Sequence, residues 1–334
     1  MILGLLSPWF AVLLAGALSA ASLGLLELGR PRLPHDHPTP RSLHERPVSR
    51  VGGLAIWAGF LPAALLGEVP GAGGSIWVAA WLLVTAVSLA DDWRAVRPAL
   101  RLGVHALAAL AVAAAMLRPD PAEAVSLAQA IAIAVTALAL VWSANLFNFM
   151  DGNDGLAAAM AICGFGAYGA AAMLAGTPAG TYLALAAATL PFLAVNLPPA
   201  RTFLGDGGSV PLGFLAAVFG FAGVRAGTWP EWFPLLVFLP FIADATVTMF
   251  RRLANREDVF EAHKRHYYQR LHQMGAGHPG TLLFYVVLIA GTCASALFTL
   301  VIDSAAGWWV LGAWASAIGA LFAGIDYHWR KSLP

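Results

Sequence analysis

The chain has 334 residues, of which 59% are hydrophobic and 11% are charged, and its mean hydropathy is +0.73. A soluble domain carries roughly 25% charged residues, so this composition excludes a water-soluble globular protein. The formal net charge is +1, and we expect no nucleic acid among its partners. Long apolar stretches recur along the chain and are typical of a polytopic, all-α integral membrane protein.

In chain order, eleven segments are long enough to be membrane helices. The first apolar run has no preceding Lys or Arg, which favours a membrane span over a cleaved signal peptide. We find no internal repeat or soluble domain, so residues 1–334 are expected to form one bundle of about 10–11 helices. The expected spans are 3–27, 52–68, 75–90, 101–117, 128–147, 156–175, 181–197, 209–225, 232–250, 280–300 and 307–325.

The basic residues predict the orientation. Seventeen of the 19 Lys and Arg residues lie in the odd-numbered connections or in the tail, and only Arg118 and Arg225 lie on the other side. The positive-inside rule therefore places the carboxy terminus in the cytoplasm and the amino terminus outside. The inward connections also hold the unusual polar residues, so we expect the active site there. These connections are 28–51, 91–100, 145–155, 198–208 and 251–279.

Two carboxylates, Asp91 and Asp92, close the third span just before Arg94. Acids at the end of an apolar helix are costly unless they are paired, hydrated or bound to a metal. They also lie at the negative end of the helix dipole, which disfavours anions. The alternative is that the two acids only mark the position where the helix leaves the membrane, with Arg94 as their partner. Neighbouring residues point about 100° apart on a helix, so the two acids are expected to have different roles.

Amides and acids are concentrated where the fifth span ends, from Asn145 to Gly155. Residues three apart share a helix face, which would pair Asn145 with Asn148 and Asp151 with Asp154. Asp206 lies between glycines in the run 203–209 that leads into the eighth span. Such a carboxylate at a helix amino terminus can hold a divalent ion that bridges phosphates, or it can simply cap the helix.

Other polar residues are less specific. Asp244 lies within the ninth span and is either functional or paired with an arginine. His263 and His266 lie in the basic ninth connection; their spacing does not suit zinc, and donors to phosphate or sugar hydroxyls fit better. His105 is interpreted as a core histidine. The arginines and glycines of residues 38–53 suit phosphate binding or contact with anionic lipid headgroups.

Together these motifs resemble the polyprenyl-phosphate N-acetylhexosamine-1-phosphate transferase family, in order and spacing, from Arg41 to Arg270. The most specific pieces are Asp91-Asp92, 145–155 and 203–209. The loop 263–270 is similar to the branch that initiates O-antigen or other surface polysaccharides. Two departures from the family pattern bear on which sugar is transferred. This loop lacks consecutive histidines, and residues 48–51 lack the usual glycine-rich form.

The resemblance implies an Mg²⁺-dependent transferase (Mn²⁺ as a substitute) in the bacterial inner membrane. Its substrates would be undecaprenyl phosphate and a UDP-N-acetylhexosamine, and its products a sugar diphospho-lipid and UMP. It implies that Asp206 binds the metal, that Asp91 deprotonates the lipid phosphate and that Asp92 helps to hold metal or substrate. The implied nucleotide-sugar residues are Asn145, Asn148, Asp151, Asp154, Asn196, Phe203, His263, Arg265 and His266, and the implied lipid-phosphate residues are Arg50 and Arg101.

Charge neutralisation and alignment are what such a phosphoryl transfer needs, and magnesium with arginine supplies them. Direct attack is favoured over a covalent intermediate. Two alternatives remain: a multispan transporter or flippase of lipid-linked sugars, and a lipid-alcohol phosphotransferase with a CDP-linked donor. The first predicts polar groups at the midplane, and the second predicts aspartates on one helical segment. A homodimer is compatible with such enzymes, although no residue marks an interface.

Overall fold

A computed structural model describes residues 8–29, 33–38, 43, 46–117, 124–258 and 263–332. The start of the expected first span and the loop residues Arg30, Arg32, Arg41 and Arg118 lie outside these ranges, as do residues 259–262. The described residues form the helices α1 (Pro8–Leu28), α2 (Gly52–Leu66), α3 (Ile76–Trp93), α4 (Pro98–Leu117), α5 (Leu127–Met150), α6 (Leu156–Leu174), α7 (Gly180–Asn196), α8 (Asp206–Arg225), α9 (Trp232–Val237), α10 (Leu239–Ala254), α11 (Tyr267–Leu271), η3 (His272–Ala276), α12 (Gly277–Ile302), η4 (Ser304–Ala306) and α13 (Gly307–Ser332).

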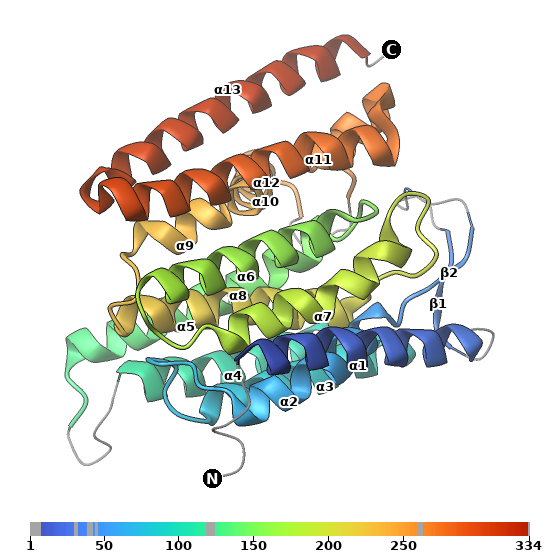
Figure 1. Cartoon of the computed structure of the whole chain (residues 1–334). Coiled ribbons are helices and arrows are strands. Elements are labelled where there is room, and N and C mark those ends of the chain that lie inside the picture. Colours follow the sequence, from blue (N-terminus) through green and yellow to red (C-terminus); the bar gives the residue numbers. More distant parts are fainter. Residues whose placement is uncertain are drawn as a thin grey trace.

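The expected all-α polytopic membrane fold is confirmed. Within the described residues, eight helices are long and apolar enough to cross a membrane, and α2 and α7 are shorter apolar helices. The long helices run roughly alongside one another, with α1, α2 and α3 on one side and α12 and α13 on the other (Figure 1). The chain is therefore a multi-pass membrane protein.

Helix α8 lies at the centre of the bundle. It packs against α3 and α5, and 83% of the residues in its apolar stretch are buried inside the protein. Glycines allow this close packing: a Cβ on Gly53 of α2 would lie 2.6 Å from the Cα of Gly208. Small residues at such contacts are typical of helix association in membranes. The start of α8 is thus fixed from several sides.

The expected ninth span, 232–250, is wrong in one respect, because it is two helices. α9 ends at Val237, and α10 begins at Leu239. Pro240 lies in the first turn of α10. Proline has no N–H to donate and its ring clashes with the preceding turn, so a continuous helix is interrupted at this point. The break gives α10 its own direction.

A small sheet, which the sequence did not predict, folds the first inward loop against the bundle. β1 (His35–Asp36) pairs antiparallel with β2 (Val48–Ser49). The backbone N–H of Phe203 donates to the carbonyl of Ser49 at 2.7 Å, and Gly52 N–H donates to the carbonyl of Phe203 at 2.9 Å. The first loop and the segment before α8 are therefore joined. In Figure 1 this sheet, α11 and the end of α13 lie at the same end of the bundle.

Candidate active site

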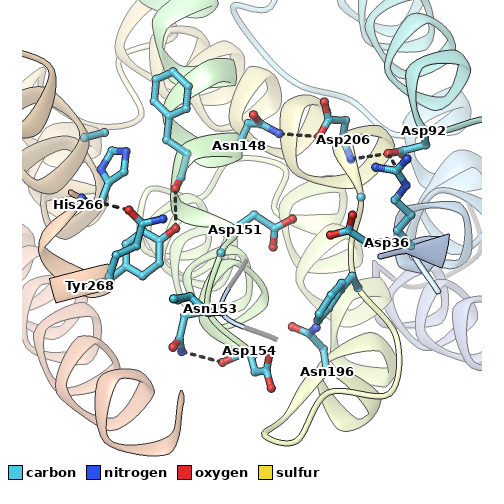
Figure 2. A pocket seen from close by; sticks show the side chains of 18 of the residues that line it. Asp36, Asp92, Asn148, Asp151, Asn153, Asp154, Asn196, Asp206, His266 and Tyr268 are labelled. Carbon is cyan, nitrogen blue, oxygen red and sulfur yellow. Dashed lines mark hydrogen bonds and ion pairs between the residues drawn. The ribbon is translucent and has the colours of Figure 1, made fainter. Parts of the chain in front are cut away.

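A polar cavity of about 620 Å³ lies where the ends of α3, α5, α7 and α8 meet the loops. Acids from three separate chain regions line it together, namely Asp91, Asp151 and Asp206. Figure 2 shows how its side chains converge. Twelve of the fourteen predicted site residues line it: Arg50, Asp91, Asp92, Arg101, Asn148, Asp151, Asp154, Asn196, Phe203, Asp206, His263 and His266.

Asp206 is the first residue of α8, three residues earlier than the expected start of this helix. Gly205 precedes it with φ of +76°, a conformation that favours glycine. One carboxylate oxygen of Asp206 accepts from Asn148 Nδ2 at 2.9 Å, and the other accepts from Arg101 Nη1 at 2.8 Å. Two donors from α5 and α4 therefore hold the Asp206 side chain at the cavity wall.

Asp92 fixes the start of α8, although the two are far apart in the sequence. Its side chain is 2% exposed, and its oxygens accept from the backbone N–H groups of Asp206 at 3.1 Å and Gly207 at 2.8 Å. These are N–H groups of the first turn, which have no partner within their own helix. Both oxygens of Asp92 are thus occupied by α8. Arg50 Nε lies 3.9 Å from the same carboxylate.

Asp91 points to a different partner, as expected for neighbouring helical residues. One oxygen accepts from the backbone N–H of Val96 at 2.7 Å, and the other forms an ion pair with Arg101. Arg101 therefore bridges Asp91 and Asp206, the two acids with the clearest expected roles. A single guanidinium sets the spacing between them.

Asp151 has no such partner. Within the described part of the chain, its carboxylate makes no hydrogen bond or ion pair, and Figure 2 shows it turned toward Asp206 and Asp36. Burial, together with the nearby charges of Asp206, Asp92 and Asp154, raises the pKa of Asp151 well above its ordinary value. A cation at this position would relieve the repulsion between these carboxylates.

The carboxylates fit a magnesium ion only in combination with substrate. Within the described ranges, no group of three or more His, Cys, Asp or Glu side chains is arranged to hold a metal. Mg²⁺ is commonly held by one or two carboxylates together with substrate phosphates and water. The all-oxygen set of Asp206 and Asp151 suits that arrangement.

A second group of polar residues fixes the loop after α5. Asn196 accepts from the N–H of Gly155 at 2.9 Å and donates to the carbonyl of Thr202 at 2.9 Å. Asp154 accepts from the N–H of Ala200 at 2.9 Å and lies 3.4 Å from His278 Nδ1. Asn196 and Asp154 therefore connect the loop 151–155 to the loop 198–202. Residues 151–155 form turns, so Asp151 and Asp154 do not share a helix face.

Buried Asp244 orders the part of the cavity wall that contains His266 and Tyr268. It accepts from the backbone N–H groups of Tyr267 at 2.9 Å and Tyr268 at 3.0 Å, and from Tyr285 Oη at 2.5 Å. His266 Nδ1 lies 3.2 Å from the same carboxylate. Asp244 thus caps α11 and orients His266; of the two interpretations that the sequence left open, pairing with an arginine is not observed among the described residues.

Aromatic packing completes this wall. The rings of His263 and His266 stack at 5.0 Å, and Tyr268 Oη donates to the carbonyl of Phe149 at 3.0 Å. Burial and the neighbouring His266 lower the pKa of His263 to about 4. At neutral pH the His263 ring is therefore an uncharged hydrogen-bonding group.

Two predicted site residues lie elsewhere. Asn145 Nδ2 donates to the carbonyl of Val141, one turn earlier in α5, and Asn145 does not line the cavity. Arg265 forms an ion pair with Glu257 and is also absent from the cavity wall. Conversely, the cavity includes His278, whose role the sequence did not indicate. Asp244 was noticed as an intramembrane acid, but its link to His266 was not.

Comparison with known proteins decides the family. The model of glycosyl transferase family 4 matches residues 75–224, which contain Asp91, Asp151 and Asp206. A decaprenyl-phosphate N-acetylglucosaminephosphotransferase of Mycobacterium tuberculosis (strain H37Rv) is 30% identical over 348 residues, covering 87% of this chain and 83% of that protein. The chain belongs to glycosyl transferase family 4.

Other relatives of this family 4 member are also named as transferases. A probable undecaprenyl-phosphate N-acetylglucosaminyl 1-phosphate transferase of Bacillus subtilis (strain 168) is 28% identical, covering 82% of this chain and 78% of that protein. A phospho-N-acetylmuramoyl-pentapeptide-transferase of Staphylococcus haemolyticus is 30% identical over 153 residues, covering 44% of this chain and 46% of that protein. The expected family is confirmed.

Proposed function

We propose that this protein transfers an N-acetylhexosamine-1-phosphate from a UDP-sugar to undecaprenyl phosphate, giving a polyprenyl-diphospho-sugar and UMP. The observation that carries the proposal is the meeting of Asp91, Asp151 and Asp206 with Arg101 in one polar cavity. The names of the relatives, which include polyprenyl-phosphate N-acetylglucosamine-1-phosphate transferases, support this reaction class.

The position of the cavity suits the two substrates. A polyprenyl phosphate carries its reactive phosphate at the membrane surface, whereas a nucleotide sugar dissolves in water. A polar cavity at one end of an apolar helix bundle is a place where both can be reached. The excess of Lys and Arg in the connections at this end supports a cytoplasmic site in the bacterial inner membrane, with the amino terminus outside. A transporter would need such groups near the midplane.

Magnesium is proposed as the cofactor, with Mn²⁺ as a substitute, and Asp206 and Asp151 as its protein ligands. When bound, the ion would neutralise charge on the diphosphate. Asp92 was expected to assist as a ligand. Its oxygens already accept backbone N–H groups of α8, so we propose instead that Asp92 fixes the position of Asp206.

The chain's own residues then have separable roles. Asp91 takes the proton from the acceptor phosphate or orients that phosphate. Arg101 balances the negative charge of the donor and the acceptor. An acceptor oxygen forms the new bond to the phosphorus that carries the sugar. The bond from that phosphorus to the oxygen of the uridine phosphate breaks, and UMP leaves. Such a transfer depends mainly on alignment and electrostatics.

Substrate recognition is assigned to the remaining wall residues. Phe203 is proposed to stack on the uracil, while Asn148 and the loop fixed by Asp154 and Asn196 surround the nucleotide. His263 and His266 are proposed to contact the sugar or the diphosphate, and Arg50 the lipid phosphate. The loop 263–270 supports initiation of an O-antigen or another surface polysaccharide.

A direct assay tests the proposal. Detergent-solubilised protein is incubated with undecaprenyl phosphate, Mg²⁺ and each of a panel of radiolabelled UDP-N-acetyl sugars. We expect UMP release and one lipid-linked product for at least one sugar, and no product after chelation of the metal. Absence of lipid-linked product with every sugar, from protein that is folded by circular dichroism, would refute the proposed reaction.

A further inference from the structure

Five arginines surround a second cavity, of about 200 Å³, at the same end of the bundle as the sheet and α11. We call it the arginine cavity; none of the residues that the structure describes lines both it and the first cavity. Its arginines come from α10, the following loop, α11 and α13, and they are Arg251, Arg252, Arg265, Arg270 and Arg330. Arg265, which the sequence assigned to the sugar site, lies here.

Positive charge exceeds negative charge in this cavity. Among the described residues two carboxylates line it, and each one contacts two arginines. Asp326 pairs with Arg251 and Arg270, at 2.6 Å and 2.5 Å. Glu257 pairs with Arg252 at 3.2 Å and also with Arg265. Arg330 is exposed and makes no ion pair within the described residues. The surplus of guanidinium groups is suited to a phosphate, which arginine binds through its forked donors.

Helix α10 separates the two cavities. Ala245 and Met249 line the first cavity, whereas Thr248 and Arg251 line the arginine cavity. A third face of α10 exposes apolar side chains, including Phe250, which is 64% exposed. An anion bound in the arginine cavity would therefore lie beside an apolar surface of the kind that contacts lipid chains.

The end of α13 has the composition of a membrane interface. Trp329 lines the arginine cavity, and Tyr327 is 57% exposed with Lys331 Nζ 4.2 Å from its ring centroid. Aromatic and basic residues are enriched at the level of lipid headgroups. Basic pockets between helices on the cytoplasmic side are suited to anionic headgroups.

We infer that the arginine cavity is a second anion site, which binds a phosphate group supplied by the headgroup of an anionic phospholipid. Its occupant is separate from the lipid substrate of the first cavity. The arginine cavity is also connected to the part of the first cavity that Asp244 orders, because Arg270 lies 5.1 Å from the centroid of the Tyr267 ring and Asp244 accepts the backbone N–H of Tyr267.

The test compares Arg330→Gln with Lys331→Gln. Both residues are exposed and adjacent on α13, and only Arg330 lines the arginine cavity. Full-length proteins are equilibrated with phosphatidylcholine vesicles containing phosphatidylglycerol, and retained phosphatidylglycerol is measured by native mass spectrometry. We expect Arg330→Gln to lower its affinity roughly fivefold, as for the loss of one direct hydrogen-bonded contact, and Lys331→Gln to match the wild type.

A competition arm distinguishes the source of the phosphate. If inorganic phosphate at millimolar concentration leaves the retained phosphatidylglycerol unchanged, the lipid headgroup is the occupant. If inorganic phosphate stabilises the wild type but not Arg330→Gln, and no phosphatidylglycerol is retained, the lipid source is overturned. Equal retention in the wild type and both variants, or equal loss in both variants, overturns the site itself.

Discussion

Arg101 Nη1 lies 2.8 Å from Asp206 Oδ2 across the candidate active site. The same guanidinium contacts Asp91, so the acid proposed to hold the metal and the acid proposed to prepare the acceptor share one cation. Removal of Arg101 would leave two nearby carboxylates unbalanced.

Asp206→Asn is expected to abolish metal-dependent UMP release, by at least about a hundredfold in kcat, the scale of losing one electrostatic contact to the transferred group. The amide oxygen of the variant can still accept from Asn148 or Arg101, so the protein should fold and insert. UMP release is measured beside a melting curve. Near-normal turnover in a folded variant would contradict the metal assignment. Asp303→Asn is a matched control, since Asp303 lies between α12 and η4, away from the cavity.

Asp91→Asn and Asp92→Asn are expected to fail differently. Asp92 accepts two backbone N–H groups of α8, and loss of part of a buried network of this kind costs about 1–3 kcal/mol. Asp92→Asn should therefore lower thermal stability as well as kcat. Asp91→Asn should lower kcat with little change in melting temperature. Similar melting shifts in the two variants would contradict the division of roles.

Gly152→Ala is expected to destabilise the loop after α5. A Cβ at Gly152 would collide with Tyr268 Oη, which is itself held by the carbonyl of Phe149. Overpacking of this kind costs about 1–3 kcal/mol. Tyr268→Phe in the same chain removes the colliding oxygen and should recover part of the loss.

Gly103→Ala serves as the matched control for this substitution. A Cβ at Gly103, in helix α4, would meet no atom within 4 Å. The change should therefore be neutral or stabilise by roughly 0.5–1 kcal/mol, as for glycine replaced inside a helix. A similar loss of stability in both variants would show that the Tyr268 contact is not the cause.

The raised pKa of Asp151 predicts a pH-dependent metal affinity. An acid whose pKa is raised in the folded protein is still partly protonated above its ordinary pKa of 3.8. A metal that binds the carboxylate must displace that proton, so Mg²⁺ affinity should rise with pH until the raised pKa is passed. Calorimetry in buffers of different ionisation enthalpy should detect proton release, and Asp151→Asn should release fewer protons.

In the absence of metal, the stability of the protein is expected to change with pH in the opposite direction to the metal affinity. Because the raised pKa means that the folded state disfavours the ionised form of Asp151, stability should fall as the pH rises from the ordinary pKa toward the raised one. Asp151→Asn should flatten this part of the stability curve. A metal-free wild type whose melting temperature is constant over this range would contradict the assigned repulsion.

Asp244 and Tyr285 are expected to act on catalysis through His266. Tyr285→Phe removes one of the hydrogen bonds to Asp244, at a cost of about 1 kcal/mol. The position of His266 should then loosen, so kcat should fall more than KM rises. His266→Ala in the same background should show no further effect of Tyr285→Phe. An additive effect would place Tyr285 outside the His266 pathway.

Much of the fold was predictable because the length of an apolar stretch is a local property of the sequence. Asp91, Asp151 and Asp206 stood out since acids at the ends of apolar helices are costly, and the structure brings them together. The break before Pro240 was missed because the surrounding sequence is apolar on both sides. Arg265 was misplaced since loop composition does not tell which face of α10 a side chain reaches.

Long-range partners were beyond the sequence for a physical reason. The contact of Asp92 with Gly207 joins residues 115 positions apart, and no spacing rule relates them. Likewise, the capping of α11 by Asp244 depends on the direction that α10 takes after the break between α9 and α10. Local patterns identified the chemical groups, while helix packing decided which group meets which.

The joining of the first loop to the segment before α8 also affects synthesis of the chain. Ser49 is held by Phe203, and Asp92 by Asp206 and Gly207. During translation the first four helices enter the membrane before these partners exist, and Asp92 then lacks the two backbone N–H groups of α8 that it accepts in the finished fold. The candidate active site therefore forms late, after α8 has inserted, and a chain truncated before residue 206 should insert without ever forming it.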